Sequence, residues 1–190
     1  MESMMEWIAR LVWDVRDKIF RMNFYSRHLI VEKVNGKLKV KLLGYEEFIE
    51  RVEKIISQAK KKYKPEKFIE TALTESKYCN FVSFDCGKNE TFLQFWRGNG
   101  KILFDYFMIP HNNLGEYKYQ VMGLLAEMGF YKMKGEGKPI SYFFRLRDMD
   151  GYWLLEANFV RDIPLASDFI LKVFKEIYKE DISQIRAKVG

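Results

Sequence analysis

Residues 78–109, YCNFVSFDCGKNETFLQFWRGNGKILFDYFMI, determine the fold of this chain. Three short segments within them, 79–86, 91–97 and 101–109, are rich in aromatic and aliphatic residues, which is typical of strands. Clusters of glycine and asparagine separate the segments and favour tight turns. Because consecutive strands joined by tight turns pair antiparallel, we predict a three-stranded meander.

Helical and strand patterns continue on both sides of this meander. The apolar periodicity predicts helices over 45–63, 114–130 and 164–178, a short tail helix over 182–189, and a second pair of strands over 140–147 and 152–160. Short strands and helices in this order, α-β-β-β-α-β-β-α, are typical of the α+β class. We therefore expect a five-stranded antiparallel sheet with helices packed on one face.

The first 44 residues are expected to be a separate appendage. Apolar residues at helical spacing over 2–22 predict an amphipathic helix. Asn35-Gly36 lies between two alternating segments, and this dipeptide predicts a β-hairpin because both residues tolerate positive φ. The expected division is an N-terminal helix and hairpin, 1–44, followed by an α+β domain, 45–190.

Composition excludes several classes of protein. The chain has 190 residues, of which 48% are hydrophobic and 31% charged, which is globular rather than disordered or fibrous. No apolar run has the ~18 residues of a membrane span, and Glu2 and Glu6 do not suit a secretory signal. Two cysteines make no disulfide framework, so we expect a cytoplasmic protein. Lysine outnumbers arginine by 22 to 10, with only four glutamines, which favours a thermophilic source.

Several local stretches resemble one family of domains. They are FLQF at 92–95, KILFDYFMIPHNN at 101–113, YQVMGLLAEMGF at 119–130, FFRL at 143–146 and NFVRDIPLASDFILKVFKEIY at 158–178. With the element order, they resemble the YbjN family and the related TY-Chap domains, which share the fold of class I type III secretion chaperones. The resemblance covers about residues 46–180. It implies a non-enzymatic, often dimeric, protein-binding domain with no catalytic residues.

The predicted sheet itself also suggests a binding surface. Segment 101–109 is apolar on both faces, with Phe104 on one and Phe107 on the other. Helices on one face leave the second face to be covered by residues 1–44 or by another subunit, and exposed aromatic patches mark interfaces. We interpret the chain as a chaperone-like domain that binds a protein partner or forms a homodimer. The residues expected to contact the partner are Trp7, Leu11, Trp96, Phe107, Tyr142 and Trp153.

Two alternatives remain open at this point. A net charge of +6 permits binding to nucleic acid through Lys60, Lys61, Lys62, Lys64, Lys67, Arg97, Arg145 and Arg147. A small enzyme could instead use Asp105, Glu156 or His111, although alternation along a strand would equally place both carboxylates on a solvated face. We expect no cofactor and no metal, because the sequence has neither CxxC nor HExxH spacing.

Overall fold

The computed structural model describes residues 27–34, 37–87, 91–97, 101–108, 113–133, 141–148 and 152–190. The predicted N-terminal helix, 2–22, lies outside these residues. The chain divides into two compact units, Met1–Arg51 and Val52–Gly190, so the boundary falls within a helix a few residues after the one expected from sequence.

The first unit contains a β-hairpin. Strands β1 (Arg27–Val34) and β2 (Lys37–Gly44) pair antiparallel, and Val34 lies opposite Lys37. This register leaves a two-residue connection, as the Asn-Gly dipeptide predicts, so the hairpin is confirmed. Helix α2 (Tyr45–Lys62) follows directly, and its acidic first turn and basic last turn complement the helix dipole.

The second unit is built on a seven-stranded sheet. Its order is β6-β7-β8-β5-β4-β3-β9, with β3 (Phe81–Asp85), β4 (Phe92–Trp96), β5 (Leu103–Met108), β6 (Tyr131–Lys132), β7 (Phe143–Asp148), β8 (Trp153–Asn158) and β9 (Arg186–Val189). The predicted meander is confirmed as β3, β4 and β5, and the second strand pair as β7 and β8. The two groups join because β5 pairs antiparallel with β8.

The predicted count of five strands is wrong, because one short strand is added at each edge. At one edge β6 pairs parallel with β7, and at the other β9 pairs antiparallel with β3. The expected tail helix is accordingly replaced by a 3-10 turn, Ile182–Gln184, and by β9. A strand is favoured there because exposed and less exposed residues alternate. Arg186 and Lys188 are exposed, whereas Val189 is buried, which is the two-residue period of a strand.

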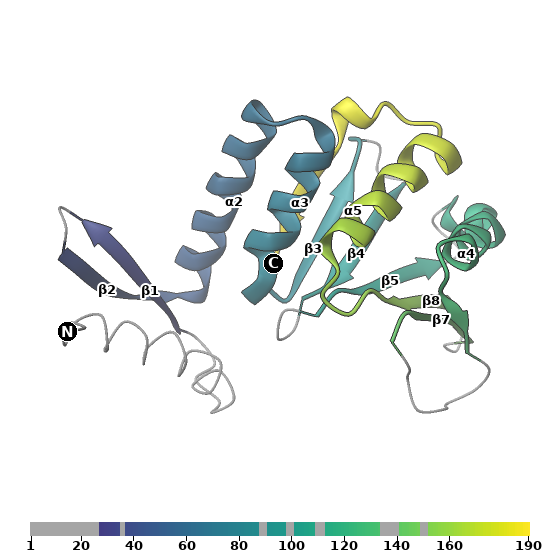
Figure 1. Cartoon of the computed structure of the whole chain (residues 1–190), viewed down its shortest axis with the longest axis horizontal. Coiled ribbons are helices and arrows are strands. Elements are labelled where there is room, and N and C mark those ends of the chain that lie inside the picture. Colours follow the sequence, from purple (N-terminus) through teal and green to yellow (C-terminus); the bar gives the residue numbers. More distant parts are fainter. Residues whose placement is uncertain are drawn as a thin grey trace. The chain divides into compact units, whose positions relative to one another are not determined.

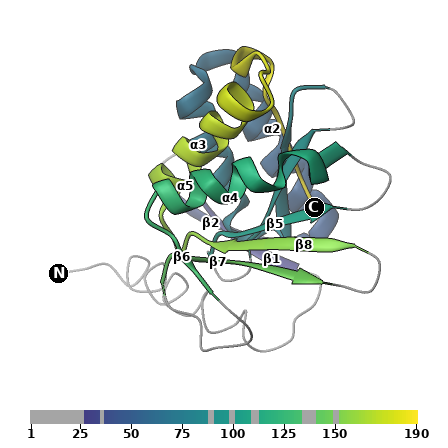
Figure 2. The ribbon, with the colours of Figure 1, turned by 90° about the vertical axis from the view of Figure 1, so that its right-hand side faces the viewer.

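Helices cover one face of this sheet (Figures 1 and 2). They are α3 (Pro65–Glu75), α4 (Lys118–Glu127) and α5 (Ile163–Lys172), which continues into a π turn, Val173–Ile177; 3-10 turns lie at Ser76–Tyr78 and Asn113–Tyr117. Asp162 begins α5 by accepting the Leu165 N–H at 3.0 Å. The α+β class and the one-sided helix layer of this unit are as expected.

Aromatic rings fill the space between the sheet and the helices. The Phe104 ring lies 5.2 Å from that of Phe95 on the next strand and 5.0 Å from that of Phe169 on α5. Nearby, the hydroxyls of Tyr106 and Tyr178 are 2.9 Å apart and satisfy each other. The high aromatic content of the chain is therefore used largely in its core.

Arg97 belongs to the interior, which corrects its assignment to a nucleic-acid surface. It is 1% exposed. Its guanidinium donates to the carbonyls of Leu73 and Lys101 at 2.6 and 2.8 Å and to the Ser76 hydroxyl at 3.3 Å. Burial lowers the pKa of this guanidinium to about 10. Arg97 thus ties the end of α3 to the β4–β5 connection.

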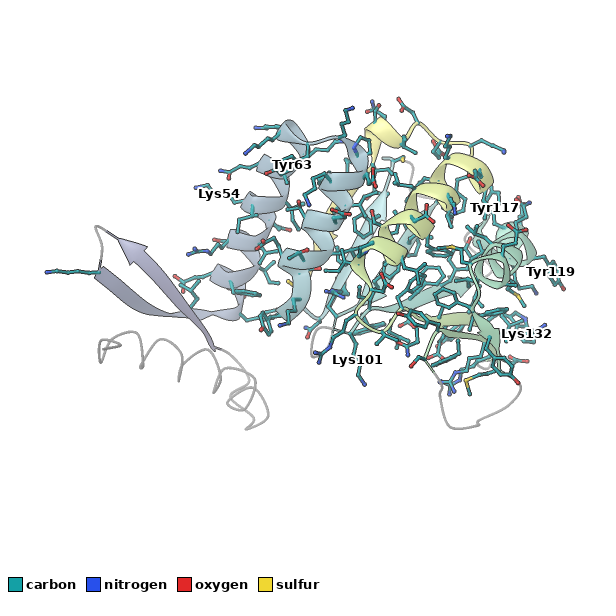
Figure 3. The ribbon with its side chains drawn as sticks, in the orientation of Figure 1. Lys54, Tyr63, Lys101, Tyr117, Tyr119 and Lys132 are labelled. Carbon is teal, nitrogen blue, oxygen red and sulfur yellow. The ribbon has the colours of Figure 1, made fainter. Side chains whose placement is uncertain are left out.

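We expect Arg97→Met to lower the free energy of unfolding by about 3 kcal/mol, because the Leu73 and Lys101 carbonyls would lose a charged donor. The matched control is Lys54→Met, since Lys54 is exposed on α2 (Figure 3) and its loss should change stability by less than about 0.5 kcal/mol. Urea denaturation measures both. Equal stability of the two variants would contradict the structural role of Arg97.

Candidate functional site

The candidate site lies on the sheet face opposite the helices, which we call the open face. Successive side chains along a strand point to opposite faces of the sheet. Because Phe104 points into the core on the helix side, its neighbours Leu103 and Asp105 point to the open face. Within residues 52–190, none of the described helices lies over it (Figures 1 and 2). By register its described members include Phe81, Ser83, Asp85, Phe92, Gln94, Trp96, Leu103, Asp105, Arg145, Arg147, Leu154, Glu156, Asn158, Arg186 and Lys188.

A row of polar residues crosses the open face at a single register. Direct cross-strand pairs join Lys188, Ser83, Gln94, Asp105, Glu156 and Arg145 in that order, from β9 to β7. Directly opposed side chains have Cβ atoms about 5 Å apart, so each member interacts with the next. Two carboxyl groups, Asp105 and Glu156, are therefore neighbours near the middle of the sheet.

Two arginines hold one of these carboxylates. The Nε of Arg145 lies 2.5 Å from Glu156 Oε2, and an Arg147 guanidinium nitrogen lies 3.5 Å from the same oxygen. Glu156 is 8% exposed, so its carboxylate has little access to water, whereas the side chains of Arg145 and Arg147 are partly exposed. A buried carboxylate needs such donors because its desolvation is otherwise too costly.

Asp105 is less well satisfied than Glu156. It is 6% exposed, and its Oδ1 atom is buried with no hydrogen-bond partner. Burial first and the neighbouring Glu156 charge second raise the pKa of Asp105 to about 7, while the hydrogen bond from Trp96 and the Arg147 charge oppose this shift. Asp105 is therefore expected to change charge near neutral pH.

Apolar side chains lie next to the polar row. Trp96 is 41% exposed and lies between Phe81 on β3 and Leu103 on β5, each directly opposite it in register. The Phe81 and Trp96 rings meet edge to face at 6.5 Å. These three residues make an apolar row across three strands, which we call the Trp96 row.

Of the six residues predicted to bind a partner, the side chains of Trp96, Tyr142 and Trp153 are described, and they do not share one face of the sheet. Trp96 lies on the open face, and Phe107 is placed there by its register opposite Leu154. Tyr142 and Trp153 lie on the helix side instead: the Tyr142 ring contacts Phe130 and its hydroxyl reaches Asp162, while Trp153 lies under Lys118 of α4. Trp7 and Leu11 are outside the described residues, as is the side chain of Phe107.

The residues predicted to bind nucleic acid do not form one surface. The lysines lie at the α2–α3 turn, where Lys60 donates to the Ser183 carbonyl and Lys67 pairs with Glu70 at 2.9 Å. Lys62 lies 5.2 Å from the Tyr63 ring, and Lys61 and Lys64 are exposed. Arg145 and Arg147 are on the open face, bound to Glu156. The lysines and the two strand arginines thus come from different elements, and apart from the buried Arg97 the nucleic-acid alternative stays a prediction.

The proposed enzymatic residues are brought together only in part. Asp105 and Glu156 are neighbours, and a carboxyl with a pKa near 7 can exchange a proton at neutral pH. His111 lies outside the described residues. Burial raises the pKa of Cys86 to about 11, which disfavours a reactive thiolate.

The described parts of the chain show neither of two other kinds of site. They contain no group of three or more histidine, cysteine, aspartate or glutamate side chains placed to hold a metal ion. None of their helices combines the length and the apolar character needed to cross a membrane.

Comparison of the chain with protein-family models, with curated proteins and with solved structures found no match. The resemblance to the YbjN family therefore stays a prediction, and the functional conclusions below depend on the open face itself.

We expect Asp105→Asn to stabilise the protein by about 2 kcal/mol at pH 8 and by much less at pH 5. Folding raises the pKa of Asp105, so the free energy of unfolding of the wild type falls as the pH rises from about 4 to about 7. The amide that replaces the carboxyl does not ionise, so the variant does not lose this stability. Urea midpoints at the two pH values measure the effect.

The control is Asp85→Asn, because Asp85 lies on the same face but is paired with Arg186 at 2.7 Å. It should cost less than about 1 kcal/mol at both pH values. A destabilising Asp105→Asn at pH 8 would contradict the assignment of Asp105 as a poorly solvated carboxyl.

Proposed function

We propose that this protein is a protein-binding domain, without enzymatic activity, that buries an apolar segment of a partner against the open face. The observation that carries the proposal is the Trp96 row. Trp96 is 41% exposed, and its neighbours Phe81 and Leu103 are only partly covered. Large aromatic side chains grouped in this way are favoured at binding interfaces, where they bury much area at a small cost in conformational entropy.

Binding fits the charged residues of this face better than catalysis does. Glu156 Oε2 is shared by Arg145 and Arg147, so this atom is already occupied and is poorly suited to accept a proton from a substrate. Asp85 is held in the same way by Arg186. Charges paired within the domain can orient a partner without reacting with it.

The first partner to consider is a segment of another protein or a second copy of this chain. Both would present apolar side chains to the Trp96 row. The resemblance to the YbjN family implies a domain that is often dimeric. The open face suits a homodimer because it carries charges of both signs, which two copies can match. Its arginines are Arg145, Arg147 and Arg186, and its carboxyl groups are those of Asp105, Glu156 and Asp85.

Peptides that bind the wild-type protein are first selected from a displayed random library. We expect Trp96→Glu to weaken their affinity by at least 100-fold. A glutamate in the apolar row would have to be desolvated in the complex. Trp153→Glu is the matched control, because Trp153 is equally exposed, at 42%, but lies on the helix side.

Peptides that bind both variants as tightly as the wild type would contradict the use of the open face. Circular dichroism and urea denaturation of both variants establish that loss of binding is not loss of folding. Failure to select any peptide that depends on Trp96 would contradict the protein-binding function itself.

Light scattering tests self-association and the nucleic-acid alternative together. We expect the mass to be unchanged by a single-stranded oligonucleotide at low salt, because the strand arginines are engaged with Glu156. A two-chain mass that Trp96→Glu halves would identify the partner as a second copy. A gain of oligonucleotide mass that disappears at high salt would favour phosphate contacts through the α2–α3 lysines instead.

A further inference from the structure

Among the described side chains of the open face, Asp105 has a buried oxygen that lacks a hydrogen-bond donor. The Oδ1 atom of Asp105 is buried and has no partner, whereas the Glu156 and Asp85 carboxylates each have an arginine. A buried acceptor without a donor costs roughly 1–3 kcal/mol, and more when it is charged. Proteins retain few such groups, so this atom needs an explanation.

The charges around Asp105 favour a cation there. The groups that face it are Glu156 from β8, Arg147 from β7, and Gln94 and Trp96 from β4; Arg145 lies beyond Glu156. The Glu156 charge acts on Asp105 more strongly than the opposing Arg147 charge does. Both arginines are directed at Glu156 Oε2, and Asp105 Oδ1 has no hydrogen-bond partner, so an ionised Asp105 would be stabilised by a further cationic donor.

The side chain next to this carboxyl suits one kind of cation in particular. Trp96 donates its indole N–H to Asp105, and the same ring is 41% exposed, so an aromatic face that solvent reaches lies in contact with the carboxyl. A planar guanidinium can stack on an indole ring and donate to a carboxylate at the same time, which an ammonium does less well.

We propose that Asp105, with Glu156 beside it and Trp96 at its edge, binds one arginine side chain of the protein segment that the open face recognises. This inference rests on the proposed protein-binding function and adds the chemistry of the partner. The apolar Trp96 row supplies contact area, and the Asp105 oxygen selects a segment that places an arginine beside its apolar residues. Binding of the cation requires the ionised carboxylate, so a proton is released from Asp105 when the site fills below neutral pH.

The test uses methylguanidinium as the probe, with N-methylurea as its neutral isostere, at constant ionic strength. The signals followed by NMR are the Trp96 indole N–H and the Asp105 side-chain carboxyl carbon. We expect a saturable shift of both signals with methylguanidinium and none with methylurea. The affinity should fall by roughly tenfold or more from pH 8 to pH 5.5, because Asp105 has a pKa of about 7.

Variants distinguish this site from general effects of the salt. Asp105→Asn should abolish the saturable shift of the Trp96 signal, and Asp85→Asn, on the same face, should leave it intact. An equal shift in Asp105→Asn, an equal response to methylurea, or saturation by Ca²⁺ in place of methylguanidinium would each overturn the proposal.

The peptides selected for the open face separate this inference from the function on which it rests. We expect them to contain an arginine whose replacement by citrulline weakens binding at least tenfold in the wild type and not in Asp105→Asn. Peptides that depend on Trp96 but are indifferent to both changes would overturn the arginine site and leave the protein-binding function standing. The absence of any peptide that depends on Trp96 would overturn the function, whatever the probe shows.

Discussion

The pairing of β5 with β8 is the constraint on which the rest of the structure depends. It joins the meander to the second strand pair and places Phe104 opposite Ala157 on the side of the helices. Because side chains alternate along a strand, burying Phe104 against Phe169 forces Asp105 and Glu156 onto the open face, directly opposite each other. A shift by one residue would bury two carboxylates in the aromatic core, so the same register fixes both the core and the site.

The charges of the open face show how the fold accommodates this constraint. Glu156 is stabilised by Arg145 and Arg147 from the adjacent strand, and Asp85 by Arg186 from the edge strand. Among the described residues, Glu156, Arg147, Gln94 and Trp96 face Asp105, and they leave its Oδ1 atom without a hydrogen-bond partner. A sheet optimised for stability alone would place an apolar residue there, since an incompletely paired buried charge is costly. Departures from local rules of this kind are typical of functional positions.

Much of the fold could be predicted from the sequence, and the site could be predicted only in part. Local patterns sufficed for the hairpins, the meander and the helices expected over 45–63, 114–130 and 164–178, because turn residues and apolar periodicity act over a few positions. They could not show that Asp105 faces Glu156, since residues 109–152, with α4, β6 and β7, separate the two strands along the chain. Local patterns also predicted a helix at the C-terminus, where pairing with β3 favours a strand. They predicted an exposed Arg97, which is buried because two carbonyls and one hydroxyl accept hydrogen bonds from its guanidinium. Contacts between residues far apart in the sequence determine the Asp105–Glu156 pair, the C-terminal strand and the burial of Arg97.

The claim at the centre of this account is that partners bind the open face. Chemical-shift mapping of the aromatic and methyl signals with a bound, library-selected peptide tests it most directly. We expect the largest shifts at Phe81, Trp96, Leu103 and Leu154, which share the open face. Shifts concentrated instead on α4 and Trp153, or on the side chains of the α2–α3 turn, would contradict it.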